Sequence, residues 1–399
     1  MITILFVNIG NYLYNLLLGR ILGPSQFADA AILITLLLVL SFIGMTFQVV
    51  TAKYAVLFDG SLLQQFLRFI LKNALVIGLF FGILTILLHN QLQQIFHTKT
   101  STMFIVFGLG LPMYFVMSIN RGLYQGKNNL KDLSKTYCFE MLCRLILTIA
   151  IILIIPTIES SLVIAFGILI SFVFGLLPFQ KSILVKEIKS DTDSLEVKPI
   201  IAFFALTAFY ELTQIIINNS DILLVKHYFN NEQAGLYASL ALIGRVVYFV
   251  AWMFVMLLLP KVIQLKKDGV DTLPILFKYV LYVVLLSTVI VLGAFLFPEL
   301  VVTIMFGEKY LPIAFLLWKY ALATSIFAIA NIFAYYFLSI NKYIPVVISA
   351  VLGLTQIVLI ILFHNSLEQV VVMQIVAMLI LLVFQLSYFV ITNNKKTAI

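Results

Sequence analysis

The residues best suited to bind or react with a ligand lie inside segments that are otherwise apolar. In segment 200–224, polar residues recur at intervals of 3 and 4, which predicts a single polar helix face made of Thr207, Glu211, Gln214, Asn218 and Asp221. A second stripe near the N-terminus has the same spacing and comprises Asn8, Asn11 and Asn15. Such stripes either line a polar cavity or bond a neighbouring helix, and the spacing leaves both interpretations open.

Charged residues within these apolar segments need an explanation, because each costs roughly 2.5–3.5 kcal/mol to insert into a bilayer. Glu140 and Arg144 are four residues apart, which predicts a structural ion pair on one helix. Arg245 has no acid within one helical turn and precedes Tyr248 and Phe249, so the sequence allows either a cation–π contact or an anionic ligand.

Two carboxylates of the 200–224 segment, Glu211 and Asp221, are candidates for coupling to an ion. Desolvation disfavours the charged form of a buried carboxylate, so such a group can exchange a proton. We therefore expect coupling to H⁺ or Na⁺ and no other cofactor. Cys138 and Cys143 lie on one predicted helix and point to different faces, so we expect no disulfide, and the sequence shows no metal-ligand spacing.

The elements that carry these residues are predicted to be transmembrane helices. Hydrophobic residues make up 63% of the chain and charged residues only 11%, well outside the usual composition of soluble domains. A helix needs about 20 apolar residues to cross a bilayer. This predicts an all-α polytopic membrane protein with about 12 spans, at 1–21, 28–52, 69–88, 102–123, 137–156, 162–183, 200–224, 233–258, 278–297, 313–338, 344–363 and 368–391.

Most of the 25 Lys and Arg residues fall on alternate connections between these spans. The positive-inside rule then predicts that both termini are cytoplasmic. The net charge of +8 is explained by this topology and by attraction to anionic bilayer lipids, and it gives no support for nucleic-acid binding.

A hydrophilic stretch near the midpoint predicts two lobes of six helices each. The expected boundaries are 1–183 for the first lobe, 184–199 for a cytoplasmic linker and 200–399 for the second lobe. The two polar stripes lie on the first helix of each lobe, so we expect both to face one central cavity. No connection is predicted to exceed about 20 residues, and a protein built almost entirely from spans favours transport over catalysis.

Four short motifs, in this order, resemble those of a known family: NLLLGRILGPSQF at 15–27, RGLYQG at 121–126, ALIGR at 241–245 and MFGEKY at 305–310. They are similar to polysaccharide-unit flippases, the O-antigen and capsule translocases of the multidrug/oligosaccharidyl-lipid/polysaccharide exporter superfamily. The resemblance runs the length of the chain. It implies a V-shaped pair of six-helix lobes that open alternately to each side of the bacterial inner membrane.

This resemblance implies a transporter without enzymatic activity that moves undecaprenyl-diphosphate-linked oligosaccharides from the cytoplasmic to the outer leaflet. Arg20, Lys53 and Arg245 match positions where relatives carry basic residues near the lipid diphosphate or sugar, although relatives more often have Arg at position 53. The asparagine and glutamine stripes would bond the sugars. Expected partners are the lipid-linked oligosaccharide, bilayer lipids and the polysaccharide polymerase machinery.

Two other functions remain open at this stage. A cation-coupled multidrug exporter of the same superfamily would need a cavity rich in carboxylates. A membrane glycan polymerase or ligase would need an outer loop of several dozen residues that carries paired catalytic groups.

Overall fold

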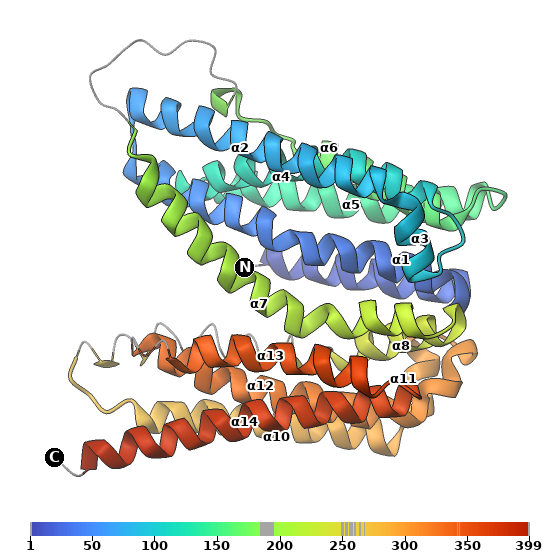
Figure 1. Ribbon diagram of the computed structural model, residues 1–399, viewed down its shortest axis with the longest axis vertical. Helices are drawn as coiled ribbons and strands as arrows, with labels where there is room; N and C mark the ends of the chain where they lie inside the picture. The colour runs from blue at the N-terminus through green and yellow to red at the C-terminus, as the bar shows by residue number, and fades with distance from the viewer. Residues whose placement is uncertain are drawn as a thin grey trace. The chain divides into compact units, whose positions relative to one another are not determined.

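The computed structural model describes residues 2–183, 195–248, 251, 254, 258, 261, 262, 265, 266, 268–340, 342 and 344–397. Within these ranges the chain is helical and contains no strand, which confirms the all-α prediction (Figure 1). The first helices are α1 (Ile2–Leu57), α2 (Gly60–Leu87), α3 (His89–Phe96), α4 (Thr102–Gly126), α5 (Leu130–Ile154), α6 (Ser160–Gly175) and the 3₁₀ turn η1 (Lys181–Ile183). They are followed by α7 (Val197–Tyr228), α8 (Asn231–Gly244), α10 (Leu273–Leu296), α11 (Pro298–Met305), the 3₁₀ helix η2 (Glu308–Leu316), α12 (Leu317–Ser339), α13 (Ile344–Leu362) and α14 (Leu367–Thr397).

Helix α1 is too long to be a single span. Its 56 residues would extend about 84 Å at 1.5 Å per residue, whereas the hydrocarbon core of a bilayer is about 30 Å thick. Gly23, with φ 73° and ψ 172°, interrupts the helix just before Pro24, a backbone conformation that glycine adopts without strain. In Figure 1 the ribbon of α1 folds back on itself. Helix α1 therefore contains the first two predicted spans.

Each remaining predicted span overlaps a described helix, whereas α3 and α11 fall between predicted spans. Among the described residues, seven helices are long and apolar enough to cross a membrane, and α7 makes an eighth as a bent pair, 197–213 and 215–228. The seven helices include α1 as one helix. Because α1 turns at Gly23, its two halves make two crossings. Helix α6 and residues 347–362 of α13 are shorter apolar helices, and α8 begins the predicted eighth span.

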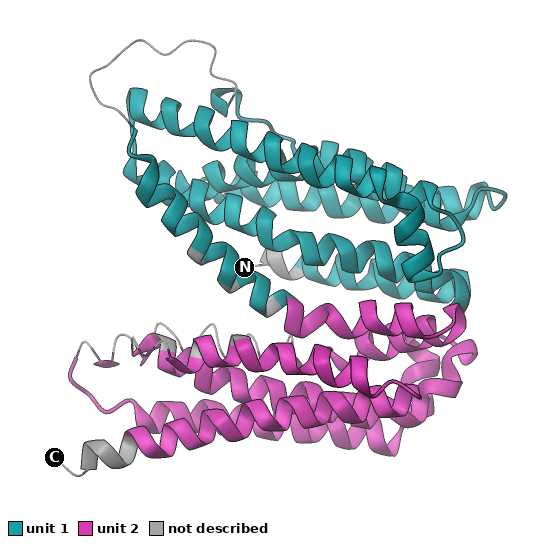
Figure 2. Ribbon diagram, viewed as in Figure 1, with its two compact units in different colours: residues 1–215 teal, residues 216–399 magenta. Residues whose placement is uncertain are grey.

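The chain divides into two compact units, residues 1–215 and 216–399 (Figure 2). The division falls inside α7. In the first unit, Ile200 of α7 lies in the buried core with Phe66 and Phe115, and the rings of Phe47 and Phe204 are 5.0 Å apart. The first half of α7 therefore belongs to the first unit, because its apolar side chains complete that core.

Close helix packing in the first unit depends on small residues. A Cβ atom added at Gly82 of α2 would lie 2.7 Å from the carbonyl oxygen of Gly108 in α4, and one at Gly108 would lie 2.8 Å from that of Gly82. Gly122 brings α4 equally close to α1, since a Cβ there would lie 2.4 Å from the oxygen of Gln48. Such backbone approach is typical of membrane helices, where lipid provides no hydrophobic drive for association.

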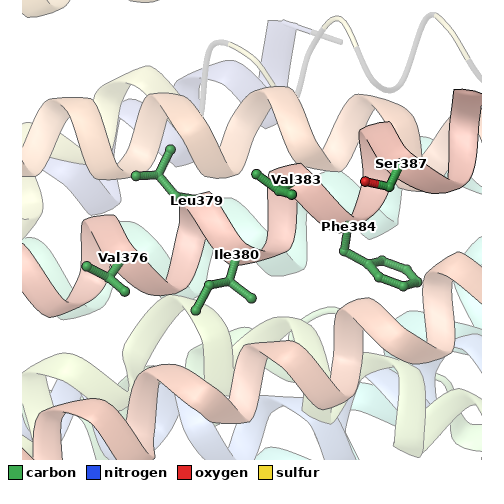
Figure 3. Close-up of a pocket in the computed structure, with 6 residues that line it drawn as sticks. All are labelled: Val376, Leu379, Ile380, Val383, Phe384 and Ser387. Carbon is green, nitrogen blue, oxygen red and sulfur yellow. The ribbon is translucent and has the colours of Figure 1, made fainter.

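The second unit is built around α12, which packs against α10 and α14. Its core contains Phe327 and Ala330 of α12, Met378 and Leu381 of α14, and Ile217 from the second half of α7. Outside this core, α14 presents an open apolar groove, shown in Figure 3, that is lined by Val376, Leu379, Ile380, Val383, Phe384 and Ser387. Apolar side chains on the outside are what a lipid-facing helix requires.

The predicted linker at 184–199 lies largely outside the described residues, since description stops at Ile183 and resumes at Leu195. The predicted lobe boundaries, 1–183 and 200–399, stay a prediction, as does the cavity expected between the lobes.

Candidate functional site: two buried arginine clusters

In the first unit, three ionisable side chains from α4 and α5 form one buried cluster. Arg121 Nη2 lies 2.7 Å from Glu140 Oε2, and Arg144 Nη1 lies 3.4 Å from Glu140 Oε1. The predicted pair between Glu140 and Arg144 is therefore confirmed. The sequence did not reveal Arg121 as the closer partner, because its position near the end of α4 resembles a charge on a cytoplasmic connection.

A hydrogen-bonded network extends from this cluster to α1. Arg121 donates from Nε to Thr136 Oγ1 at 3.1 Å, and its guanidinium carbon lies 3.9 Å from the ring centroid of Tyr137. The Tyr137 hydroxyl donates to Gln48 Oε1 at 3.0 Å, and Gln48 Nε2 donates to Gln125 Oε1 at 2.9 Å. The network fixes the orientation of Arg121 through contacts on three helices.

The asparagine stripe of α1 meets the same cluster. Arg144 donates from Nη2 to Asn11 Oδ1 at 2.6 Å, and Asn15 Nδ2 donates to the carbonyl oxygen of Asn11 at 2.9 Å. Asn8 is exposed. For Asn11 the structure thus shows bonding between helices, one of the two interpretations that the spacing left open. Sugar binding by Asn8, Asn11 and Asn15 stays a prediction.

In the second unit, Asp221 of α7 is the acceptor for three donors. Arg245 Nη2 lies 2.9 Å from Asp221 Oδ1, while the hydroxyls of Tyr320 and Tyr237 donate to Oδ2 at 2.8 and 3.1 Å. Arg245 also donates from Nε to the Tyr320 hydroxyl at 3.2 Å and from Nη1 to Asn219 Oδ1 at 3.2 Å. Every nitrogen of the Arg245 guanidinium therefore has an acceptor in this structure.

The helices α8 and α12 position this second cluster. Arg245 follows the last residue of α8, and Thr324 of α12 donates to the carbonyl oxygen of Gly244 at 2.9 Å. A Cβ atom at Gly244 would lie 2.3 Å from the Tyr320 ring, so glycine is needed for the ring to pack there. Asp221 is only 1% exposed, and its charge balances that of Arg245 inside the unit.

Arg245 has no acid close to it in the sequence, yet in the structure it forms an ion pair. Its partner, Asp221, is 24 residues away on another helix, beyond the reach of a helical-spacing argument. Of the aromatic residues considered, Tyr248 stacks on Phe327 with centroids 5.3 Å apart, and Phe249 lies outside the described residues. Anion binding by Arg245 and ion coupling by Asp221 stay predictions.

The remaining predicted site residues lie apart from these clusters. Glu211 and Asn218 are half-buried on α7, and the side chain of Gln214 lies outside the described part of the chain. Arg20 and Lys53 are both exposed on α1, and Lys53 Nζ lies 3.6 Å above the ring of Phe203. Their roles stay predictions. The described residues contain no group of three or more His, Cys, Asp or Glu side chains able to hold a metal ion.

The fold and these clusters define a multi-pass, all-helical membrane protein with a buried arginine–carboxylate cluster in each unit. The chain belongs to the polysaccharide biosynthesis protein family, whose sequence profile matches residues 17–315. This agrees with the family resemblance drawn from the motifs at 15–27, 121–126, 241–245 and 305–310. A comparison with curated protein sequences gives no match.

Solved structures with the same fold include a lipid II flippase, MurJ, in an inward closed conformation, with a TM-score of 0.77 and 15% sequence identity over 97% of this chain and 86% of that one. An inward-facing multidrug resistance transporter of the MATE family, from the MOP superfamily, gives a TM-score of 0.75 and 14% identity over 98% of this chain and 96% of that one. A eukaryotic MATE transporter gives 0.64 and 11% identity over 96% of this chain and 91% of that one. At such low identities these likenesses define the fold.

Proposed function

We propose that the protein is a flippase that moves undecaprenyl-diphosphate-linked oligosaccharide repeat units from the cytoplasmic to the outer leaflet of the bacterial inner membrane. The observation that carries the proposal is the polysaccharide biosynthesis family match, which covers residues 17–315 of a chain that is almost entirely apolar helix. A membrane-embedded member of such a family acts where the growing glycan meets the bilayer.

The chemistry of the cargo explains why the protein needs polar groups at membrane depth. The sugars carry many hydroxyls, and each unpaired hydroxyl costs about 2–7 kcal/mol to bring into hydrocarbon. The diphosphate is an anion and costs more. A path lined by amides and cations lowers this barrier, while the polyprenyl tail stays in lipid.

We assign the diphosphate to Arg20, Lys53 and Arg245 and the sugars to the asparagine and glutamine stripes, Asn8, Asn11, Asn15, Gln214 and Asn218. Arg20 and Lys53 are exposed, so they are accessible to an anionic headgroup in this conformation. Arg245 would first have to exchange Asp221 for a phosphate. Such an exchange preserves charge pairing for the arginine throughout transport.

The proposal extends to energetics and assembly. Glu211 and Asp221 couple transport to H⁺ or Na⁺, and the lobes alternate in access about the 184–199 linker. Both termini are cytoplasmic, and the cargo passes to the polysaccharide polymerase machinery at the outer face. The protein itself has no enzymatic activity in this scheme.

Deletion of the gene in the source bacterium tests this function. We expect loss of surface polysaccharide and accumulation of lipid-linked oligosaccharide on the cytoplasmic side, both restored by the wild-type chain. If single repeat units instead reach the outer leaflet without being joined, the protein is a polymerase or ligase. If surface polysaccharide is unchanged while tolerance to cationic drugs falls, it is a multidrug exporter.

A further inference from the structure

The two buried arginine clusters differ in their balance of charge. In the second unit, one arginine, Arg245, faces one carboxylate, Asp221. In the first unit, Arg121 and Arg144 share the single carboxylate of Glu140, and neither forms an ion pair with another acid in the described part of the chain. The first cluster therefore carries one uncompensated positive charge. A buried charge without a partner is costly, which makes this cluster attractive to an anion.

Of the three arginines in the two clusters, Arg144 has the longest contact with its carboxylate. Its contact with Glu140 is 3.4 Å, compared with 2.7 Å for Arg121 and 2.9 Å for Arg245 with Asp221. Its other acceptor, Asn11, is a neutral amide. The Arg144 side chain also keeps 13% of its surface exposed, about twice the 6% of Arg121. The excess charge is therefore best assigned to Arg144.

Three polar atoms around Arg144 are buried, and none has a hydrogen-bond partner among the described residues outside this group of three. They are Nε of Arg144 itself, the hydroxyl of Tyr14 on α1 and the hydroxyl of Thr148 on α5. The guanidinium carbon of Arg144 lies 5.6 Å from the ring centroid of Tyr14, and Thr148 is one helical turn along the same face of α5. All three atoms can donate a hydrogen bond, so together they match an anionic oxygen acceptor.

We propose that Arg144, Tyr14 and Thr148 form a binding site for a phosphate-type anion. The source of this anion, the diphosphate of a lipid-linked oligosaccharide, rests on the proposed function. Arginine suits this role because its planar guanidinium matches the oxygens of a phosphate, and the long contact with Glu140 is the one most readily exchanged. Glu140 then remains paired with Arg121, so the exchange leaves no carboxylate unpaired.

Binding to the purified full-length protein in nanodiscs tests the site, with farnesyl diphosphate and inorganic pyrophosphate as separate probes. We expect Arg144→Gln to weaken binding of farnesyl diphosphate by about tenfold or more, since hydrogen bonds to charged groups are the strong ones. Arg144→Lys keeps the charge and should recover part of the affinity. Lys135→Gln removes the same charge from an exposed position of α5 and should leave the affinity unchanged.

Two further variants separate ligand binding from a structural role, because Arg144 also bonds Asn11 and Glu140. Tyr14→Phe and Thr148→Val each remove one of the two buried hydroxyls and leave the shape nearly intact. If the hydroxyls bind the anion, each change weakens binding by about threefold, corresponding to one hydrogen bond. If the hydroxyls only pack inside the unit, each change leaves binding unaltered, which overturns the site.

The outcomes distinguish this inference from the proposed function. A phosphate-type site is supported if the Arg144→Gln, Tyr14→Phe and Thr148→Val variants all bind both probes more weakly. A lipid-linked source is identified if the wild type binds farnesyl diphosphate more tightly than pyrophosphate. Tight binding by the wild type that none of these variants alters overturns the site and leaves the proposed function standing. No binding of either probe by the wild type counts against both.

Discussion

At the scale of single residues, the two clusters show how charges are kept inside an apolar protein. Each carboxylate serves more than one donor, and each cluster joins side chains of different helices: α4 with α5 in the first unit, and α7 with α8 and α12 in the second. Because charge and hydrogen bonds are shared in this way, removal of one member leaves others unpaired.

Replacement of Asp221 by asparagine tests this in the second unit. The change leaves Arg245 buried without a counter-charge, and loss of one partner from a buried pair costs about 3–5 kcal/mol. We expect a large fall in the free energy of unfolding, measured with denaturant in mixed micelles. The double variant Asp221→Asn, Arg245→Gln should recover part of it, because no charge then remains unpaired. If the double variant loses as much free energy of unfolding as the two single variants together, the two residues act independently.

The same residues mark the limit of sequence reasoning. Glu140 and Arg144 could be paired from the sequence because four residues on one helix fix their distance. Arg121 with Glu140, and Asp221 with Arg245, could not be, because these contacts depend on which helices are neighbours. The predicted sites for the diphosphate, the sugars and the ion were derived without this knowledge, and they stay predictions.

At the scale of elements, the apolar pattern predicted helices well, because hydrocarbon permits few other structures and each span needs a minimum length. The turn at Gly23 within α1 separates predicted spans 1–21 and 28–52. The linker was placed by composition alone. It did not reveal that Ile200 and Phe204 of α7 pack into the core of the first unit, since apolar residues in a span give no sign of which neighbour they meet.

Helix contact between α1 and α4 should be sensitive to a single methyl group. Gly122→Ala would bring a Cβ to 2.4 Å from the carbonyl oxygen of Gln48, and such overpacking costs about 1–3 kcal/mol. We expect a lower melting temperature in detergent. Gly293→Ala on α10 is the matched control, because its added Cβ would come within 4 Å of no described neighbouring helix or side chain. Equal effects of the two changes would argue against the close contact.

Asn120 of α4 should anchor the segment after α6. Its Nδ2 donates to the carbonyl oxygens of Leu176 and Pro178 at 3.0 Å, and its Oδ1 accepts from the backbone of Gln180 at 3.1 Å. Asn120→Ala frees these backbone groups, so we expect faster tryptic cleavage at Lys181. Ser118 donates its hydroxyl to the carbonyl oxygen of Tyr114 within α4, so Ser118→Ala should be cleaved at the wild-type rate. Unchanged cleavage of both variants would show that other contacts hold the segment.

At the scale of the whole molecule, the distribution of Lys and Arg predicts which connections face the cytoplasm. A cysteine at exposed Lys99 should react with an impermeant maleimide on intact cells, and one at exposed Lys131 only after the membrane is opened. Cys138 and Cys143, both free, are first replaced by serine. The reverse labelling pattern would invert the predicted topology.

Transport in purified proteoliposomes shows whether this protein carries a lipid-linked oligosaccharide across a bilayer, as we propose. A fluorescent polyprenyl-diphosphate oligosaccharide is confined to the inner leaflet, and its arrival in the outer leaflet is followed with an impermeant quencher. We expect quenching that depends on the protein and that is slower with Arg144→Gln but not with Lys135→Gln. Quenching no faster than in protein-free vesicles would show that the protein does not move this cargo.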